Sequence, residues 1–542
     1  MAYDASSSNV RRIRLAALLV SSVTLVATAA PTLAADPAFV SHSPSMLTPL
    51  TPGSSATPLL TVGETIGSYM FDTLPDGISV NGGGPGRLVL YVNHETSKVP
   101  FPYTPAVPTE ANSQNDFKNA RLSRIVMETD GLEILGGRYV IPSSANYQRF
   151  CSNFMAGSAQ GFDKRILFTN EEATDFVSRT GTAWQFGQVT TEPPSEQAGV
   201  VVAYNPKNGN YKTIYSMGRL NHENAVALRG YGHPVLLTGD DTFTTDPAQS
   251  QIYQYQAASR AQLMADAGTL YGFRATTPGY DDYYDFAIGS TVSIAGTFVA
   301  MDPSAATGTQ SALEADSDAK GVFQFLRIED MAYDRTNPNI VYIADSGRAV
   351  GTDATNRFPS TNGRIWKMIL DPSDPTIVTS LSILIEGEGC RLKDPTVIHQ
   401  ADNLETTVNS LLITEDPSSG NQFTSTDTSS DATTARVWLY DLASGTKSVV
   451  ARVDQSLDES VGDVDAAAKG NLGSWETTGI IDVSKWFGAG AFLINVQAHS
   501  MWIAKAPGPD QTGPTAGTPD TVPDWTFKRE GGQLLLLRIP GA

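Results

Sequence analysis

The sequence predicts an all-β protein, a β-propeller with six expected blades, and three observations support this prediction. Six short apolar runs end abruptly in acidic, amide or histidine side chains. The ends recur at intervals of roughly 70 to 105 residues, and strands at a near-fixed period are typical of repeat architectures. Each run is followed by a second strand-like segment that closes in a turn. The six runs are Leu88–Glu95, Ile166–Glu172, Val235–Asp241, Ile340–Asp345, Leu411–Asp416 and Phe492–His499.

The first residues indicate an export signal rather than a structural element. Three arginines lie among residues 11–14, and the apolar stretch after them is too short for a stable transmembrane span. This stretch ends in Thr32–Ala34, a small-x-small cleavage pattern. We therefore expect residues 1–35 to be a signal peptide, of the twin-arginine or the Sec type. Residues 36–542 should then form one secreted or periplasmic propeller domain without stable membrane insertion.

The second strands alternate apolar and polar residues and end in Asn-Gly, Asp-Pro or Ser-Gly turns, as half-buried strands do. They are Arg124–Gly131, Gly199–Gly209, Gln251–Tyr255, Gly363–Pro372, Arg436–Gly445 and Gln533–Ile539. The repeat before Asp345 is longer than the others. We assign its extra length, residues 257–320, to an insertion on a surface loop.

The composition restricts the partners and leaves the two cysteines open to two interpretations. A formal net charge of −20 argues against binding to nucleic acid or to an anionic membrane. Cys151 and Cys390 are the only cysteines. One disulfide is the ordinary expectation for an exported chain. A metal-bound thiolate at Cys151 is the alternative.

A third recurring element carries the chemistry. Upstream of five of the acidic ends, a potential metal ligand begins a strand-like stretch. In a propeller the innermost strands line the axis, so these residues should form a ring at one mouth of the central channel. Carboxylates that lie this close repel one another unless a cation binds them. All-oxygen ligands favour calcium, magnesium or manganese, and a thiolate favours iron or zinc. The starting residues are Cys151, Glu223, Glu329, Asp402 and Glu476, and the glutamates expected at the strand ends are Glu95, Glu171, Glu172 and Glu415.

Three other residues fit around such a ring. Arg327 stands two residues before Glu329, and a guanidinium suits bidentate binding of phosphate, although an ordinary salt bridge is the alternative. His94 and His222 each precede a glutamate in an Asn-His-Glu triplet. Because strand neighbours point to opposite faces, we expect these histidines to support the scaffold rather than to share the metal.

The chain resembles the PhoX family of bacterial alkaline phosphatases. The resemblance runs from about residue 60 to the C-terminus. Its most specific parts are the cysteine followed about twenty residues later by paired glutamates, and the Arg-x-Glu triplet. The matching stretches are Tyr91–Glu95, Cys151, Leu167–Glu172, Gly218–Glu223, Leu237–Asp241, Arg327–Glu329 and Ala401–Leu404.

The resemblance implies a β-propeller with iron and calcium at the channel mouth, exported, which hydrolyses small-molecule phosphomonoesters. Carried over, Cys151 is the iron thiolate ligand, and Glu223 and Glu329 are carboxylates on the iron side. Arg327 holds the phosphate, with Asn403 beside it in the substrate site. The remaining ring residues supply further iron or calcium ligands: Glu95, Glu171, Glu172, Asp402, Glu415 and Glu476.

Two other functions fit parts of the pattern. A secreted, calcium-stabilised propeller could act as a binding module, without iron and without colour. A calcium-dependent propeller hydrolase acting on lactones, diesters or phytate shares the oxygen ring but does not require Cys151. The family's Thr-Pro-Trp-Gly-Thr segment is replaced here by Ser158–Arg165, a departure that bears on substrate choice.

Overall fold

Six groups of β-strands make up most of the computed structural model. The signal-peptide prediction falls outside the residues that the structure describes. No helix in the described part is long and apolar enough to cross a membrane. The described residues are 38–96, 119–180, 195–243, 248–348, 360–416, 422, 431–455, 473–499, 501–504, 525–528 and 530–542.

Each group begins with an inner strand and continues outward through antiparallel neighbours. Groups 1 and 2 are β5 (Pro75–Gly82), β6 (Arg87–His94), β7 (Arg121–Glu128), β8 (Ile134–Ile141), and β9 (Phe150–Ala156), β10 (Ile166–Glu171), β13 (Val201–Tyr204), β14 (Tyr211–Ile214). Groups 3 and 4 are β15 (His222–Ala227), β16 (Val235–Asp240), β17 (Ile252–Gln256), β18 (Thr269–Ala275), and β20 (Ile328–Tyr333), β21 (Ile340–Asp345), β22 (Arg364–Leu370), β23 (Ile377–Glu386). Groups 5 and 6 are β24 (Ala401–Thr406), β25 (Ser410–Glu415), β26 (Arg436–Asp441), β27 (Lys447–Val453), and β28 (Glu476–Asp482), β29 (Ala491–Ala498), β32 (Gly531–Arg538), β2 (Ser55–Thr61).

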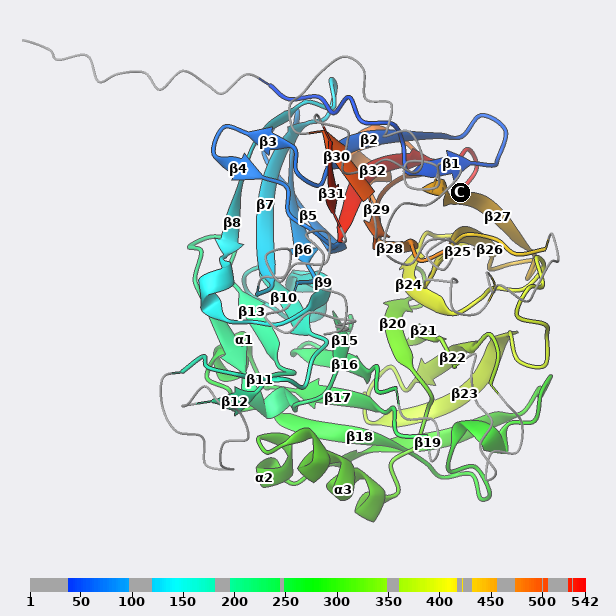
Figure 1. The fold of residues 1–542 in the computed structure, drawn as a ribbon. Coiled ribbons are helices and arrows are strands. Elements are labelled where there is room, and N and C mark those ends of the chain that lie inside the picture. The colour runs from blue at the N-terminus through cyan, green and yellow to red at the C-terminus, as the bar shows by residue number, and fades with distance from the viewer. Residues whose placement is uncertain are drawn as a thin grey trace, which may run out of the picture. The chain divides into compact units, whose positions relative to one another are not determined.

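The inner strands close a ring. Each of β5, β9, β15, β20, β24 and β28 lies against the next, and β28 lies against β5 again. Figure 1 shows these strands facing a common centre, with the later strands of each group outside them. The prediction of a nearly all-β propeller is therefore confirmed.

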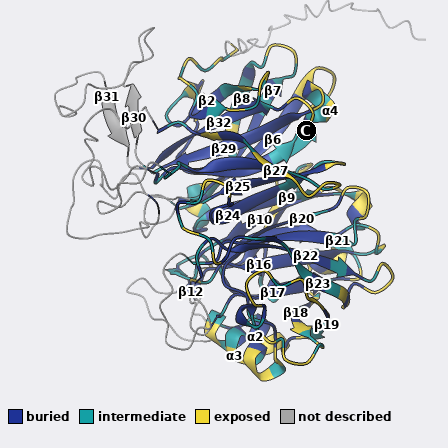
Figure 2. Cartoon of the chain, turned by 90° about the vertical axis from the view of Figure 1, so that its right-hand side faces the viewer, coloured by how far each residue is buried: buried dark blue, intermediate teal, exposed yellow. Residues whose placement is uncertain are grey.

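The remaining elements are short. The paired strands are β3 (Thr65–Ile66) with β4 (Tyr69–Met70), β11 (Phe176–Val177) with β12 (Glu196–Gln197), and β30 (Met501–Ala504) with β31 (Trp525–Lys528). The helices are α1 (Arg260–Met264), α2 (Pro303–Ala306), α3 (Gln310–Lys320), α4 (Ser484–Phe487) and the 3₁₀ turns Ser143–Ala145, Ser158–Gln160, Tyr215–Met217 and Tyr283–Asp285. In Figure 2 the strands are mostly buried, whereas α3 and the connecting turns carry most of the exposed residues.

The predicted surface loop over residues 257–320 is wrong. This segment holds helices α1–α3 and two strands, β18 and β19 (Ser293–Ala300). Strand β19 pairs with β18 and with β23, so groups 3 and 4 share one nine-stranded sheet. In β19 every second residue is largely buried, because one face of the strand packs on the core. The Tyr-, Asp- and Ser-rich composition around these strands hid their period-two pattern.

Strands from the start of the chain complete the last two groups. Strand β1 (Leu47–Pro49) pairs with β27, and β2 pairs with β32. The ring is thereby closed by hydrogen bonds between segments that are far apart in sequence. Closure leaves fewer open sheet edges, which protects a propeller from edge-to-edge association.

Candidate metal centre

A β-bulge near the start of each inner strand places one residue toward the channel. In five inner strands the register shifts directly after the first residue, and in β28 it shifts after Thr478. A bulge inserts an extra residue and re-aims its side chain. The residues at this position are Asp76, Cys151, Glu223, Glu329, Asp402 and, in β28, Gly479.

A second set of acids comes from the neighbouring strands. Strands β6, β10, β16 and β25 are each followed at once by an acidic residue. Because successive strand residues point to opposite faces, the residue after the strand faces the channel when the last strand residue faces the sheet. The four acids are Glu95, Glu172, Asp241 and Asp416.

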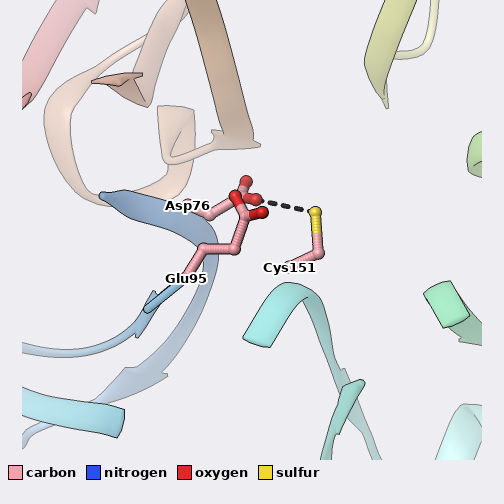
Figure 3. Close-up of side chains that lie close together, drawn as sticks. All are labelled: Asp76, Glu95 and Cys151. Carbon is pink, nitrogen blue, oxygen red and sulfur yellow. Dashed lines mark hydrogen bonds between the residues drawn. The ribbon is translucent and has the colours of Figure 1, made fainter. Parts of the chain in front are cut away.

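The two sets meet in ligand clusters. Three overlapping groups each hold three ligand atoms within 4.8 Å of one another. Figure 3 shows the first, in which the carboxylates of Asp76 and Glu95 approach Cys151 and the thiol donates a 2.7 Å hydrogen bond to Asp76 Oδ2. The groups are Asp76–Glu95–Cys151, Cys151–Glu172–Glu223 and Glu223–Glu329–Asp402.

Burial raises the pKa of every carboxyl group in these clusters, and neighbouring acids add to the shift for all of them except Glu95. Burial raises the pKa of Asp76 to about 7, and the nearby Glu95 adds to the shift. The pKa values of Glu172 and Glu223 lie well above their usual range, first through burial and then through the surrounding acids. Burial and the same acids raise the pKa of the Cys151 thiol well above its ordinary value. Cations would remove this repulsion and replace the protons.

The donor set fits more than one kind of cation. Carboxylate oxygens suit calcium, and a thiolate among carboxylates suits a transition metal such as iron. The thiol is available because Cys151 and Cys390 are both free, so the ordinary expectation of a disulfide is wrong. Cys151 lies buried in the cluster, whereas Cys390 is half-buried in the segment between β23 and β24.

Arg327 borders the cluster and is held by three carboxylates. Its Nε and Nη2 atoms donate to both oxygens of Asp241 at 2.9 Å. Nη2 also donates to Glu329 at 2.6 Å, and Nη1 donates to Asp416 at 3.0 Å. The guanidinium further lies 4.5 Å from the ring centre of Phe243. Arg327 thus forms buried ion pairs at the edge of the ligand groups, rather than a surface salt bridge.

Two predicted ligands lie elsewhere. Glu171 and Glu415 are the last residues of β10 and β25 and point into their own strand groups. Glu171 accepts from the backbone N–H groups of residues 148, 199 and 200 and pairs with Arg179 at 2.5 Å. Glu415 pairs with Arg436 at 2.7 Å and accepts from Trp438 Nε1. Both predictions of metal ligation are wrong, because strand alternation turns these acids away from the channel.

The two histidines occupy comparable scaffold positions. The Nε2 atom of His94 is 2.7 Å from the Ser123 hydroxyl, and Nδ1 of His222 is 2.7 Å from the Thr238 hydroxyl. Burial lowers both histidine pKa values to about 4, so both rings are neutral near pH 7. Their position agrees with the expectation of a supporting role.

Glu476 and Asn403 lie near the cluster, and both have contacts outside the three ligand groups. Glu476 lies 3.7 Å from His499, and burial raises its pKa to about 8. It stands three residues before the bulge of β28, so it belongs to none of the three groups. Asn403 follows the bulge residue of β24; its amide donates to Ser152 Oγ at 3.0 Å and accepts from the Thr478 hydroxyl at 2.9 Å. It therefore ties strand groups together.

Three acids at the centre were missed from the sequence. Asp76 precedes Glu95 by 19 residues, within the 13 to 21 residues that separate the other starting ligands from their acidic ends. Asp241 and Asp416 are the second acids of the Gly-Asp-Asp and Thr-Glu-Asp endings, as Glu172 is of Asn-Glu-Glu. The spacing to Glu95 is the signal for Asp76, and the second place in an acidic pair is the signal for Asp241 and Asp416.

A cavity of about 630 Å³ lies at the later residues of the same inner strands, beyond the layer of Asn403 and Ser152. Its wall includes Phe154, Tyr333 and Trp486. None of the clustered ligands lines it, so this cavity and the ligand clusters occupy different levels of the channel.

Comparison with known proteins agrees with this geometry. The family model described as alkaline phosphatase PhoX matches residues 165–497, more than half of the chain. The structure of Pseudomonas fluorescens PhoX in complex with vanadate, a transition state analogue, is 15% identical with a TM-score of 0.57, covering 93% of this chain and 97% of that chain. That of the NanB sialidase from Streptococcus pneumoniae is 7% identical with a TM-score of 0.39, covering 89% of this chain and 71% of that chain.

No curated protein matches the chain. At 15% identity the Pseudomonas structure shows a shared fold. The family model covers the bulges of groups 3 to 6 and the paired glutamates of group 2. The protein belongs to the alkaline phosphatase PhoX family and is a phosphatase with a propeller fold.

Proposed function

We propose that the protein is an exported phosphatase that hydrolyses small-molecule phosphomonoesters with iron and calcium at the channel mouth. The observation that carries this proposal is the meeting of one thiol, from the second inner strand, with buried carboxylates from the first, third, fourth and fifth inner strands. A thiol surrounded by acids is a poor nucleophile while it stays protonated. As a thiolate it is a good ligand for iron.

The residues divide into two neighbourhoods. Cys151 belongs to two of the three groups, so it and its neighbours Asp76, Glu95 and Glu223 would hold iron. The all-oxygen group that includes Glu329 and Asp402 would hold calcium. When bound, these ions supply Lewis acidity toward phosphoryl oxygens and lower the pKa of bound water.

Arg327 would neutralise the charge of the phosphoryl group. Its orientation is fixed by the bidentate hydrogen bonds to Asp241 on one side and by the hydrogen bond to Asp416 on the other. A guanidinium held in place before the substrate arrives stabilises developing charge without reorganisation. Glu329 competes with the phosphoryl group for the same Nη2 atom, so cation binding to Glu329 would leave that donor available to substrate.

The test begins with elemental analysis and the visible absorption spectrum of purified, unchelated protein. We expect iron and calcium, and a thiolate-to-iron absorption band that disappears in Cys151→Ala. The matched control is Cys390→Ala, which should keep the band and the metal content because Cys390 lies outside the ligand groups. Calcium alone in a colourless protein would contradict the iron assignment and favour an iron-free hydrolase or a binding module.

Activity is tested on p-nitrophenyl phosphate and on the diester bis(p-nitrophenyl) phosphate. We expect hydrolysis of the monoester, loss of turnover together with metal in Glu223→Gln, and retention of metal with a raised KM in Arg327→Lys. Hydrolysis of the diester alone would contradict the monoester proposal. Cell fractionation tests export, and a full-length precursor retained in the cytoplasm would contradict that part.

A further inference from the structure

At the rim of the metal centre the structure contains a second arginine that the proposed function does not use. Arg348 stands two residues after Ser346, which follows β21, and Phe243 stands two residues after Asp241, which follows β16. The two positions are equivalent in neighbouring strand groups 4 and 3. Both residues therefore emerge at the same end of the channel as the ligand clusters.

The ring of Phe243 connects the two arginines. Its centre lies 4.5 Å from the guanidinium carbon of Arg327 and 5.9 Å from that of Arg348. Phe243 is 39% exposed, which is unusual for a phenylalanine in this structure. An aromatic ring left open beside two guanidinium groups fixes them by cation–π contact and offers an apolar surface at the entrance.

The two arginines differ in how far their charge is already neutralised. Arg327 is buried and donates to three carboxylates. Arg348 is half-buried, and among the described residues no carboxylate lies within ion-pair distance of its guanidinium. Its backbone is nevertheless fixed, because its N–H donates to the Ser360 hydroxyl at 2.8 Å and that hydroxyl donates to Glu388 at 2.7 Å.

A positioned cation that has no carboxylate partner within the described ranges stands out at a mouth crowded with acids, on a chain of net charge −20. A dianionic phosphoryl group would bind at the metal centre, so a cation at the rim faces the rest of the substrate, the leaving group. Its chemistry complements a negative charge there, and the ring of Phe243 complements an apolar or planar body between the two charges.

We propose that Arg348 and Phe243 form a leaving-group subsite, and that the preferred substrates are phosphomonoesters whose leaving group carries a second anionic group. This inference rests on the proposed function and specifies its substrate class. Arg348 is a specificity residue in this scheme: it contacts the leaving group and takes no part in the chemical step. Its removal should affect doubly anionic substrates and spare the others.

The test uses two esters of equal shape, 4-carboxyphenyl phosphate and 4-carbamoylphenyl phosphate, on the protein with its metals. The ratio of their kcat/KM values, compared between variants, cancels their intrinsic reactivities. Arg348→Gln should lower this ratio about tenfold, as expected for one charge-assisted hydrogen bond at a half-exposed site. Arg348→Lys should retain part of the ratio. The control Arg274→Gln, on the outer strand β18, should leave it unchanged.

Two results would overturn the subsite. An unchanged ratio in Arg348→Gln would show that the carboxylate does not meet this arginine. An equal fall on both esters, with the ratio preserved, would show a merely structural effect.

Binding separates this inference from the proposed function. The corresponding non-hydrolysable phosphonates, 4-carboxybenzylphosphonate and 4-carbamoylbenzylphosphonate, are titrated by calorimetry. Arg348→Gln should weaken binding of the carboxylate about tenfold and leave the amide unchanged; equal affinities in both variants refute the subsite. If the metal-loaded protein hydrolyses neither ester, the proposed function fails, and the phosphonate comparison still decides the role of Arg348.

Discussion

Glu171 and Glu172 are neighbours in sequence, and the structure gives them opposite tasks. Glu171 closes β10 and holds its own strand group together, whereas Glu172 faces the ligand clusters. Replacing each by glutamine keeps the size of the side chain and removes its charge. The two variants should therefore separate the energetics of the scaffold from those of the metal centre.

The scaffold variant should be destabilised. Glu171 accepts three backbone hydrogen bonds and pairs with Arg179 at 2.5 Å, with side-chain exposures of 0% and 6%. Breaking a buried ion pair from one side costs about 3–5 kcal/mol, because the partner charge stays buried and unpaired. For a chain of this length the unfolding entropy converts that into a fall of about 3–5 °C in the apparent Tm. The metal content of folded Glu171→Gln should be unchanged.

The metal-centre variant should behave in the reverse way. Burial and then the acids around it, Glu95 first, raise the pKa of Glu172 well above its usual range. In chelator-treated protein, Glu172→Gln relieves this repulsion, so the Tm should be equal to or above that of the parent. A metal ion at about 100 times its Kd stabilises a folded site by about 2.7 kcal/mol. That stabilisation should be mostly lost in Glu172→Gln.

The assay is differential scanning calorimetry with chelator and with both iron and calcium, together with elemental analysis of each variant. The parent, the two variants and the double variant form one cycle. If Glu171→Gln loses metal while keeping its Tm, or if Glu172→Gln loses several degrees in chelator, the assignment of the two side chains to opposite faces is refuted.

Three further predictions concern the same centre. Raising the pH from 5 to 9 should lower the Tm of metal-free protein. The pKa values of Asp76 and Glu476 are raised to about 7 and about 8, so the folded chain keeps protons that the unfolded chain releases near pH 4. A Tm that rises with pH in calorimetry would contradict this. Gly479→Ala should destabilise the fold by at least about 1–2 kcal/mol in denaturant titration, because φ is +44° and a Cβ would overlap the backbone carbonyl of Asp76; the reasoning fails if the midpoint is unchanged. Asn403→Ala removes the 3.0 Å bond to Ser152 and should lower the Tm by about 1–2 °C without changing KM; a KM effect alone would return Asn403 to the substrate site.

Much of the fold could be predicted from the sequence, because the sequence patterns that indicate it are local and repeated. Apolar runs that end in acidic, amide or histidine side chains recur in every strand group, and turn residues separate them. The strands within residues 257–320 could not be predicted from the sequence. Polar segments separate β18 and β19 from each other along the chain, and these segments obscure the alternation of apolar and polar residues within each strand. Strand β19 also pairs with β23, which lies far along the chain, and such pairing leaves no local signal.

Part of the site could also be predicted from the sequence, because its ligands recur at similar places in the repeats. Residue type showed which acids were unusual, and Cys151, Glu223, Glu329 and Asp402 meet as expected. The direction in which each acidic side chain points could not be predicted, because a shift of one residue along a strand turns a side chain to the other face. Glu171 was therefore taken for a ligand, although the bulges and strand ends turn it away from the channel.

The closure of the ring by β2 and β32 has a consequence for when the metal can bind. These partners are separated by most of the chain, so their pairing is a contact of very long range, which forms slowly. Group 1 supplies Asp76 and Glu95, and its inner strand β5 contacts β28, β29 and β32 of group 6. We therefore expect the metal centre to be completed in a late step of folding. The compartment in which folding finishes will then decide which cations are available to the protein.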